Sequence, residues 1–324
     1  MVTTDSSVIG SEQAYLDRLQ DVTVQPVFIV GPHRSGTTLL YRVLEATGRF
    51  NAVTLFHILN RHRLLQLHFG GRLKAAWEEL DRDFEARGVK GEDQNSAKVS
   101  PDILEEYCYS FDYQGRRPIL DEKNLPGFRQ FCQKLQLLQE PGRPLLLKNP
   151  FDTPNFLPMQ RMLPQARFVF IYRHPAAVIN SQMRMLRYEF EKRREYEAIL
   201  IPRFERLYRS PMKLALARFI YSERFPLLFQ QVSRNVSRSF DYVTENIDKL
   251  GPAAMGVTYT ELCQNTNPVV RRILDFLGLD PELSRDFSTM VRSREAPLLP
   301  EVQHHYAWIE KRNAAYLRRF QPRS

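Results

Sequence analysis

A glycine-containing loop near the N-terminus has the residue types and the spacing to hold a phosphate group. Residues 31–38 read GPHRSGTT, with two glycines spaced as in the loop G-x-x-x-x-G-K-[ST] of nucleotide hydrolases. Such a loop turns backbone N–H groups inward and ends at a helix N-terminus, and both features attract phosphate oxygens. Gly36 is followed by Thr37 instead of lysine, and the cation of the loop is Arg34. The loop therefore predicts an anion site without the lysine that reaches the β- and γ-phosphates of ATP.

A second combination of cation and hydroxyl follows a later apolar segment. Residues 167–172 (RFVFIY) are rich in aromatic and β-branched residues, which predicts a strand. Arg173 follows this strand, Pro175 suits the start of a helix, and Ser181 lies further along that helix. Ligands of open α/β sheets bind outside the carboxyl ends of the strands. The sequence thus offers two separated anion sites to a ligand with phosphate groups at both ends.

Both segments resemble those with which sulfotransferases bind the donor 3′-phosphoadenosine 5′-phosphosulfate (PAPS). The family's first loop is written P-[KR]-S-G-T-T, and here His33 separates Pro32 from the basic residue. The resemblance spans about residues 26–299 and is nearest to the bacterial-type and carbohydrate-type enzymes. It implies a loop that holds the 5′-phosphosulfate through Arg34, Ser35, Gly36, Thr37 and Thr38. It also implies that Arg173 and Ser181 bind the 3′-phosphate.

The resemblance implies a reaction as well as a ligand. A sulfuryl group would pass by in-line displacement from PAPS to a hydroxyl or amine, releasing 3′,5′-adenosine bisphosphate. No bound metal is expected, because sulfuryl transfer of this kind needs none and the sequence has no H-x-x-x-H cluster. The acceptor is expected to be a small molecule, a lipid or a carbohydrate, and no pattern in the chain distinguishes these three.

Lys148 is the candidate for stabilising the leaving group. It follows the short apolar run 145–147, so it is expected to point into the cleft and, with Arg34, to neutralise charge on the bridging oxygen. The alternative is a lysine that merely extends to solvent at a strand end. Many relatives place a histidine base two or three residues after this lysine, where the present chain has Pro150 and Phe151.

The general base must therefore come from elsewhere, and three candidates remain open. His57 lies in a region that supplies a catalytic acid or base in several related families, and imidazole has a suitable pKa. Glu105 and Glu106 resemble an acidic segment near the acceptor pocket of similar bacterial sequences. Asp152 is the weakest candidate. His57 and the two glutamates also have structural interpretations, as a packed histidine and as acids at the start of a helix.

The elements that must position these residues alternate along the chain. Apolar runs at 26–30, 145–147, 167–172 and 255–259 predict strands, and helical patterns lie between them. This order predicts an α/β fold with a P-loop-type parallel sheet flanked by helices. We expect one sulfotransferase domain over 1–324, with a core at about 24–300 and helical insertions capping the active-site cleft at about 51–130 and 182–250.

Two local predictions concern the first of these insertions. Residues 51–95 show no strand signal and are expected to form helices and loops. Ser100, Pro101 and Asp102 resemble a helix N-terminus, with a cap, a proline at the first position and an acid in the first turn. A helix is therefore expected to follow them through Tyr109.

Composition narrows the class of protein further. The 324 residues carry a formal charge of +9, which is compatible with nucleic-acid binding or with a basic cleft for a polyanionic small molecule. The chain lacks nucleic-acid-binding signatures, so no such partner is expected. It has three distant cysteines, no secretory signal and no long apolar run. These features predict a cytoplasmic protein without a transmembrane segment, and peripheral membrane contact stays open.

Two alternative functions compete with this interpretation. A P-loop kinase or NTPase would need lysine after Gly36 and a magnesium-binding aspartate after a second strand, where the chain has Arg173. A catalytically inactive sulfotransferase-like protein that still binds the nucleotide is the other, because no histidine follows Lys148 at the usual distance.

Overall fold

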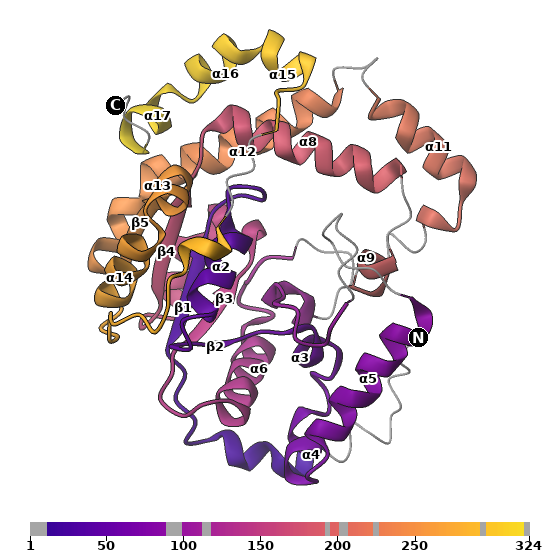
Figure 1. Ribbon diagram of the computed structural model, residues 1–324, viewed down its shortest axis with the longest axis vertical. Coiled ribbons are helices and arrows are strands. Elements are labelled where there is room, and N and C mark those ends of the chain that lie inside the picture. Colours follow the sequence, from indigo (N-terminus) through magenta and orange to yellow (C-terminus); the bar gives the residue numbers. More distant parts are fainter. Residues whose placement is uncertain are drawn as a thin grey trace.

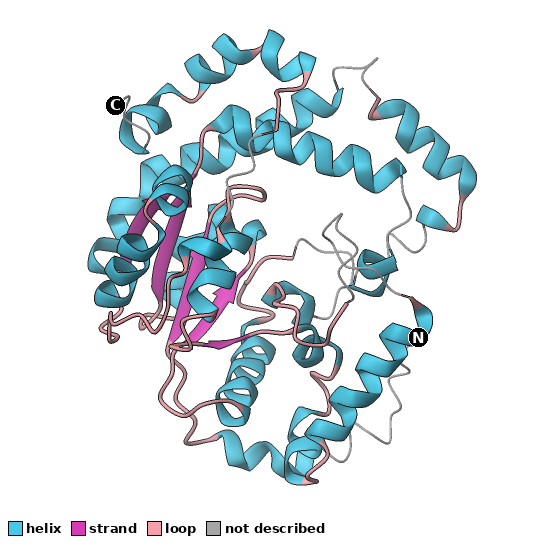
Figure 2. Ribbon diagram, in the orientation of Figure 1, coloured by secondary structure: helices cyan, strands magenta, loops and turns pink. Residues whose placement is uncertain are grey.

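A parallel sheet of five strands forms the centre of the protein in this computed structural model (Figures 1 and 2). The structure describes residues 12–88, 99–111, 118–191, 195–200, 207–222, 227–291 and 296–320. The strand order is β2-β3-β1-β4-β5. The strands are β1 (Pro26–Val30), β2 (Asn51–Ala52), β3 (Leu145–Lys148), β4 (Arg167–Tyr172) and β5 (Ala254–Thr258).

Helices precede, connect and follow these strands. The α-helices are α2 (Thr37–Glu45), α3 (Leu55–Leu59), α4 (Leu64–Phe69), α5 (Leu73–Arg87), α6 (Leu125–Leu138), α7 (Phe156–Met162), α8 (Pro175–Glu191), α9 (Glu195–Leu200), α11 (Pro211–Ile220), α12 (Leu227–Asn246), α13 (Tyr259–Gln264), α14 (Thr266–Phe276), α15 (Pro300–His304), α16 (Tyr306–Arg312) and α17 (Ala314–Phe320). The 3₁₀ helices are η1 (Gln13–Leu19), η2 (Tyr107–Ser110), η3 (Pro150–Asn155), η4 (Ile247–Ala253) and η5 (Ser288–Met290).

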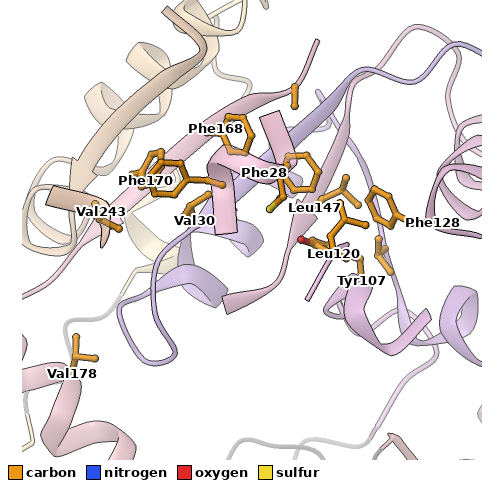
Figure 3. Close-up of a cluster of buried hydrophobic side chains, with 14 of the residues drawn as sticks. Phe28, Val30, Tyr107, Leu120, Phe128, Leu147, Phe168, Phe170, Val178 and Val243 are labelled. Carbon is orange, nitrogen blue, oxygen red and sulfur yellow. The ribbon is translucent and has the colours of Figure 1, made fainter. Parts of the chain in front are cut away.

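Alternation along the strands creates a core on each face of the sheet. In β1, Phe28 and Val30 face one core, whereas Val27 and Ile29 face the other. The first core packs beneath α6, α7, α8 and α12, and the second beneath α2, α13 and α14. Figure 3 shows aromatic side chains of the first core stacked across neighbouring strands. Burial on both faces explains why these strands are continuous apolar runs.

The predicted α/β class is confirmed, as are the strands expected at 26–30, 145–147, 167–172 and 255–259 to within a residue or two. The expectation of no strand in 51–95 is wrong, because Asn51 and Ala52 pair with β3. This strand is too short to show a periodic pattern. Part of its edge is completed by a side chain, since the Gln139 amide exchanges two hydrogen bonds with the Ala52 backbone.

The helix predicted from Pro101 through Tyr109 is wrong up to Glu106, and only its end, from Tyr107, lies in the 3₁₀ helix η2. The backbone at 103–105 is instead tied to 53–55, with hydrogen bonds from Leu55 N to Ile103 O (2.8 Å) and from Glu105 N to Val53 O (2.9 Å). A single antiparallel bridge joins Thr54 and Leu104. A local N-cap signal is worth only about 1 kcal/mol, so this pairing overrides it. The extended segment carries the two glutamates to the sheet edge.

The C-terminal helices pack onto the layer formed by α8 and α12 (Figure 1). Tyr316 of α17 stacks on Phe240 of α12 with ring centroids 3.9 Å apart, and Phe320 stacks on Tyr172 at the end of β4. Helix α17 is thereby fixed beside the carboxyl end of β4. Among the described helices, none has both the length and the apolar character that crossing a membrane requires.

Candidate active site

The loop after β1 closes tightly around its own backbone. Arg34 and Gly36 both have positive φ, at 70° and 107°, and α2 begins at Thr37. A Cβ on Gly36 would lie 2.6 Å from the ring of Tyr259, so no larger residue fits without displacing that ring. This conformation brings the loop onto the N-terminus of a nine-residue helix, as an anion cradle requires.

Ser35 is the residue of this loop whose environment points most directly to a ligand. Its side chain is fully buried, and its hydroxyl has no hydrogen-bond partner among the described residues. Buried hydroxyls are normally paired, because leaving one unpaired costs about 1–3 kcal/mol. A phosphate or sulfate oxygen would supply the missing partner.

The two predicted anion-binding segments meet at Arg34. Its Nε donates a hydrogen bond to Ser181 Oγ at 3.0 Å, and Arg173 Nη1 donates to the Arg34 carbonyl at 3.0 Å. The Arg173 guanidinium lies 4.1 Å from the centroid of the Tyr259 ring, a cation–π contact that fixes its direction. Residues far apart in sequence therefore place two guanidinium groups and a serine hydroxyl together at the carboxyl edge of β1 and β4.

Three residues that support this edge were missed by the sequence analysis. Gln182 donates from Nε2 to the carbonyl of His33 at 2.8 Å, which holds the loop against α8. The Tyr316 hydroxyl lies 3.3 Å from both the backbone nitrogen and the carbonyl oxygen of Arg173. Tyr259 directly follows β5, and its place at the end of the run 255–259 could have identified it. Tyr316 carries no such signal, because α17 reaches the site only through tertiary packing.

Lys148 stands at the centre of a second cluster at the same edge. Its Nζ donates to Thr38 Oγ1 at 3.1 Å and to Glu106 Oε1 at 3.0 Å. The lysine is only 5% exposed, so its ion pair with Glu106 is largely shielded from solvent. Burial opposes ionisation of Glu106, but the charges of Lys148 and His33 and hydrogen bonds from Lys148 and Cys108 outweigh burial and lower its pKa. A lysine, a loop threonine and an ionised carboxylate are thus in mutual contact.

Glu105 and Glu106 differ in their surroundings. Glu105 is also buried, but its Oε2 accepts a hydrogen bond from the Glu106 backbone nitrogen at 3.3 Å. Neighbouring residues of extended backbone point to opposite sides. The carboxylate in the ion pair with Lys148 is that of Glu106.

His57 occupies the cap of α3. Its Nδ1 accepts the backbone N–H of Thr54 at 3.1 Å and lies 2.9 Å from Thr54 Oγ1, which completes a capping box. Burial lowers the pKa of His57 to about 4, so the ring is neutral near pH 7. Because Nδ1 accepts a backbone hydrogen bond, the single ring proton is on Nε2. Neither nitrogen then has a free lone pair with which to take a proton from an acceptor.

Asp152 is held in a structural network. Its carboxylate accepts hydrogen bonds from Tyr107 Oη (2.5 Å), Asn149 Nδ2 (2.7 Å), Asn155 Nδ2 (2.7 Å) and the backbone nitrogen of Leu120 (3.0 Å). Burial raises its pKa, and these hydrogen bonds act in the opposite direction. Four donors leave the carboxylate little capacity for an acceptor proton, so the network is suited to holding η3 beneath Lys148.

Comparison with known proteins identifies the family to which this arrangement belongs. A sequence model described as the sulfotransferase family matches residues 26–225. The chain belongs to the sulfotransferase family. The matched region contains the phosphate loop, Lys148 and the segment from Arg173 to Ser181. No curated protein matches the sequence at a significant level.

Solved sulfotransferase structures share the fold of this family member. The crystal structure of sulfotransferase STF9 from Mycobacterium avium superposes with a TM-score of 0.62 at 12% identity, covering 98% of this chain and 83% of that one. Sulfotransferase STF1 from Mycobacterium tuberculosis H37Rv gives a TM-score of 0.56 at 16% identity, with 95% and 81% covered. At these identities the likeness establishes the architecture, and residue roles rest on the geometry above.

Proposed function

We propose that this sulfotransferase uses PAPS as its donor and transfers the sulfuryl group to a hydroxyl or amine of a small-molecule acceptor. The observation that carries the proposal is the contact of Arg34 with both Ser181 and Arg173, because it unites the two anion-binding segments. A donor with phosphate groups at both ends needs two such segments at one sheet edge.

The residues divide between the two ends of the donor. We assign the 5′-phosphosulfate to the loop residues Arg34, Ser35, Gly36, Thr37 and Thr38, where the unpaired hydroxyl of Ser35 and the helix N-terminus favour an anion. The 3′-phosphate is assigned to Arg173 and Ser181. A guanidinium grips two oxygens at once and stays charged at any relevant pH.

Lys148 is assigned to the bridging oxygen. In sulfuryl transfer the acceptor oxygen or nitrogen forms a bond to sulfur while the bond from sulfur to the 5′-phosphate oxygen breaks, and negative charge collects on the leaving bisphosphate. Lys148 already contacts Thr38 of the loop, so its ammonium group needs only a short movement to reach that oxygen. Preorganised cations of this kind stabilise the transition state without reorganisation.

Glu106 is the base that the geometry favours over His57 and Asp152. The acceptor proton would pass to its carboxylate as the new bond to sulfur forms. When Lys148 turns toward the donor, its charge and hydrogen bond lower the pKa of Glu106 less, while burial continues to raise that pKa. Donor binding would therefore make Glu106 a stronger base at the moment it is needed. If Glu106 acts as the base, the lack of a histidine shortly after Lys148 does not imply an inactive protein.

The decisive experiment is calorimetric titration with 3′,5′-adenosine bisphosphate in the absence of metal, with ATP and Mg²⁺ as the comparison. We expect the bisphosphate to bind and ATP to bind poorly. Arg173→Ala and Ser181→Ala should each weaken bisphosphate binding at least about tenfold, whereas Arg82→Ala, on the exposed side of α5, should not. A preference for ATP with Mg²⁺ would instead support a kinase.

The acceptor site is proposed to lie between the segments 51–130 and 182–250, within a single domain over 1–324. Glu106 lies in the first segment, and α8, α11 and α12 lie largely in the second. A screen of phenols, alcohols and amines with labelled PAPS would identify the class of acceptor. Transfer to none of them, together with bisphosphate binding, would favour an inactive relative.

A further inference from the structure

A pocket of about 480 Å³ lies away from the site described above, between α12 and the C-terminal helix α16. It is lined by Phe229, Gln230, Ser233, Arg234, Ser237, Arg238, His305, Trp308 and Arg312. Figure 1 shows α15 and α16 at the outer edge of the molecule, next to the layer of α8 and α12. The volume of the pocket falls within the range of small-molecule sites, about 300–1,000 Å³.

Two serines leave the hollow open between the helices. Ser233 and Ser237 lie one turn apart on α12 and are each only 2% exposed, at a place where larger side chains would fill the space. Ser233 donates its hydroxyl to the Gln230 carbonyl at 3.3 Å. The Ser237 hydroxyl is buried and has no hydrogen-bond partner among the described residues. Such an orphaned hydroxyl in a pocket points to a polar ligand atom.

Two exposed arginines give the pocket its charge. Arg234 and Arg238 lie one turn apart on the face of α12 that borders the pocket. Within the described part of the chain, neither makes a salt bridge or hydrogen bond, whereas Arg312 on the opposite wall is paired with Asp241 through both terminal nitrogens. The pocket thus presents two cations whose charge is not neutralised by a neighbouring carboxylate. This pattern favours an anion.

Aromatic rings form the apolar part of the pocket. The Phe229 ring lies 4.5 Å from that of His305 and 6.1 Å from that of Trp308, measured between centroids. Trp308 is 49% exposed, although large aromatic residues usually bury most of their surface. A flat apolar body could stack on these rings and remove part of their surface from water.

From these observations we propose that the pocket between α12 and α16 binds a small aromatic anion. Its ring lies against Phe229 and Trp308, its acidic group reaches Arg234 and Arg238, and a polar atom meets the Ser237 hydroxyl. This site is separate from the donor site and does not depend on the identity of the donor. Its ligand is recognised by the combination of a ring and a negative charge.

The probe for this proposal is 4-nitrobenzenesulfonate, with the neutral 4-nitrobenzenesulfonamide as its comparison. Trp77 and Trp308 are the two tryptophans of the chain, so a Trp77→Phe background reports on Trp308 alone, and nitroaromatic binding should quench its emission. Calorimetry gives the affinity in all variants. We expect saturable binding of the sulfonate, and binding of the sulfonamide at least about tenfold weaker.

Variants of the full chain locate the site. Arg234→Gln combined with Arg238→Gln should weaken sulfonate binding at least about tenfold, while the matched surface change Arg82→Gln should leave it unaltered. Arg173→Ala, which changes the donor site, should also leave it unaltered. Thermal melting of each variant checks that the fold persists. The proposal is overturned if the sulfonate shows no saturable binding, if the double variant binds normally, or if Arg173→Ala abolishes binding.

Discussion

Replacing Glu106 by glutamine tests the catalytic assignment and the energetics of the buried pair together. At 3.0 Å, the attraction between Glu106 and Lys148 is about 5–6 kcal/mol for an effective dielectric constant of about 20. Glutamine keeps the size and a carbonyl acceptor but leaves the lysine charge buried without a counter-charge. Removing one member of a buried pair typically costs about 3–5 kcal/mol, and we expect a value near the lower end because the hydrogen bond persists.

The loss of stability should depend on pH and on ligand. Glu106 has a folded-state pKa below its ordinary value of 4.5, so its contribution is fully present above that value and is lost as pH falls through the folded pKa. The difference between wild type and Glu106→Gln, measured by urea unfolding, should therefore be constant near neutral pH and shrink below pH 4.5. Saturating 3′,5′-adenosine bisphosphate should stabilise the variant more than the wild type, because its phosphate gives Lys148 a new partner.

The same variant should retain bisphosphate affinity at or above the wild-type level but lose about 10²–10⁴ in turnover, the usual contribution of a general base. Turnover is followed as sulfuryl transfer from labelled PAPS to an acceptor found by screening. Glu105→Gln is the matched control and should keep most of the turnover. Normal turnover in Glu106→Gln would refute the assignment of the base, and unchanged stability would refute the account of the buried pair.

Two further substitutions separate roles within the site. Lys148→Ala should lower turnover by about 10²–10³ and weaken bisphosphate binding far less than Arg173→Ala does. If calorimetry shows that the variant binds the bisphosphate and its turnover equals that of the wild type, the role of Lys148 at the leaving group is contradicted. His57→Ala should lower the free energy of unfolding by about 1–3 kcal/mol, because the Thr54 N–H loses its acceptor, while turnover stays within a few fold of wild type. If turnover instead falls by two orders of magnitude while the protein stays folded, His57 is the general base.

The sequence predicted the parts of this protein whose physics is local. Buried parallel strands must be apolar along their whole length, so β1, β3, β4 and β5 were visible as runs. The phosphate loop was visible because Gly36 has a backbone conformation and a contact with Tyr259 that larger residues cannot adopt. The family followed from the residues of the phosphate loop and of the segment from Arg173 to Ser181, and the match over residues 26–225 confirms it.

Tertiary structure decided which polar residues meet. Pairing of residues 103–105 with 53–55 overrode the N-cap signal at Ser100 and brought Glu106, rather than His57, to Lys148. A histidine among apolar residues is expected both for a catalytic base and for a helix cap. Only the contact of His57 with Thr54 distinguishes these two roles. The role of Tyr316 and the pocket between α12 and α16 likewise depend on how the C-terminal helices pack. Such contacts join positions far apart in the chain, and no local spacing encodes them.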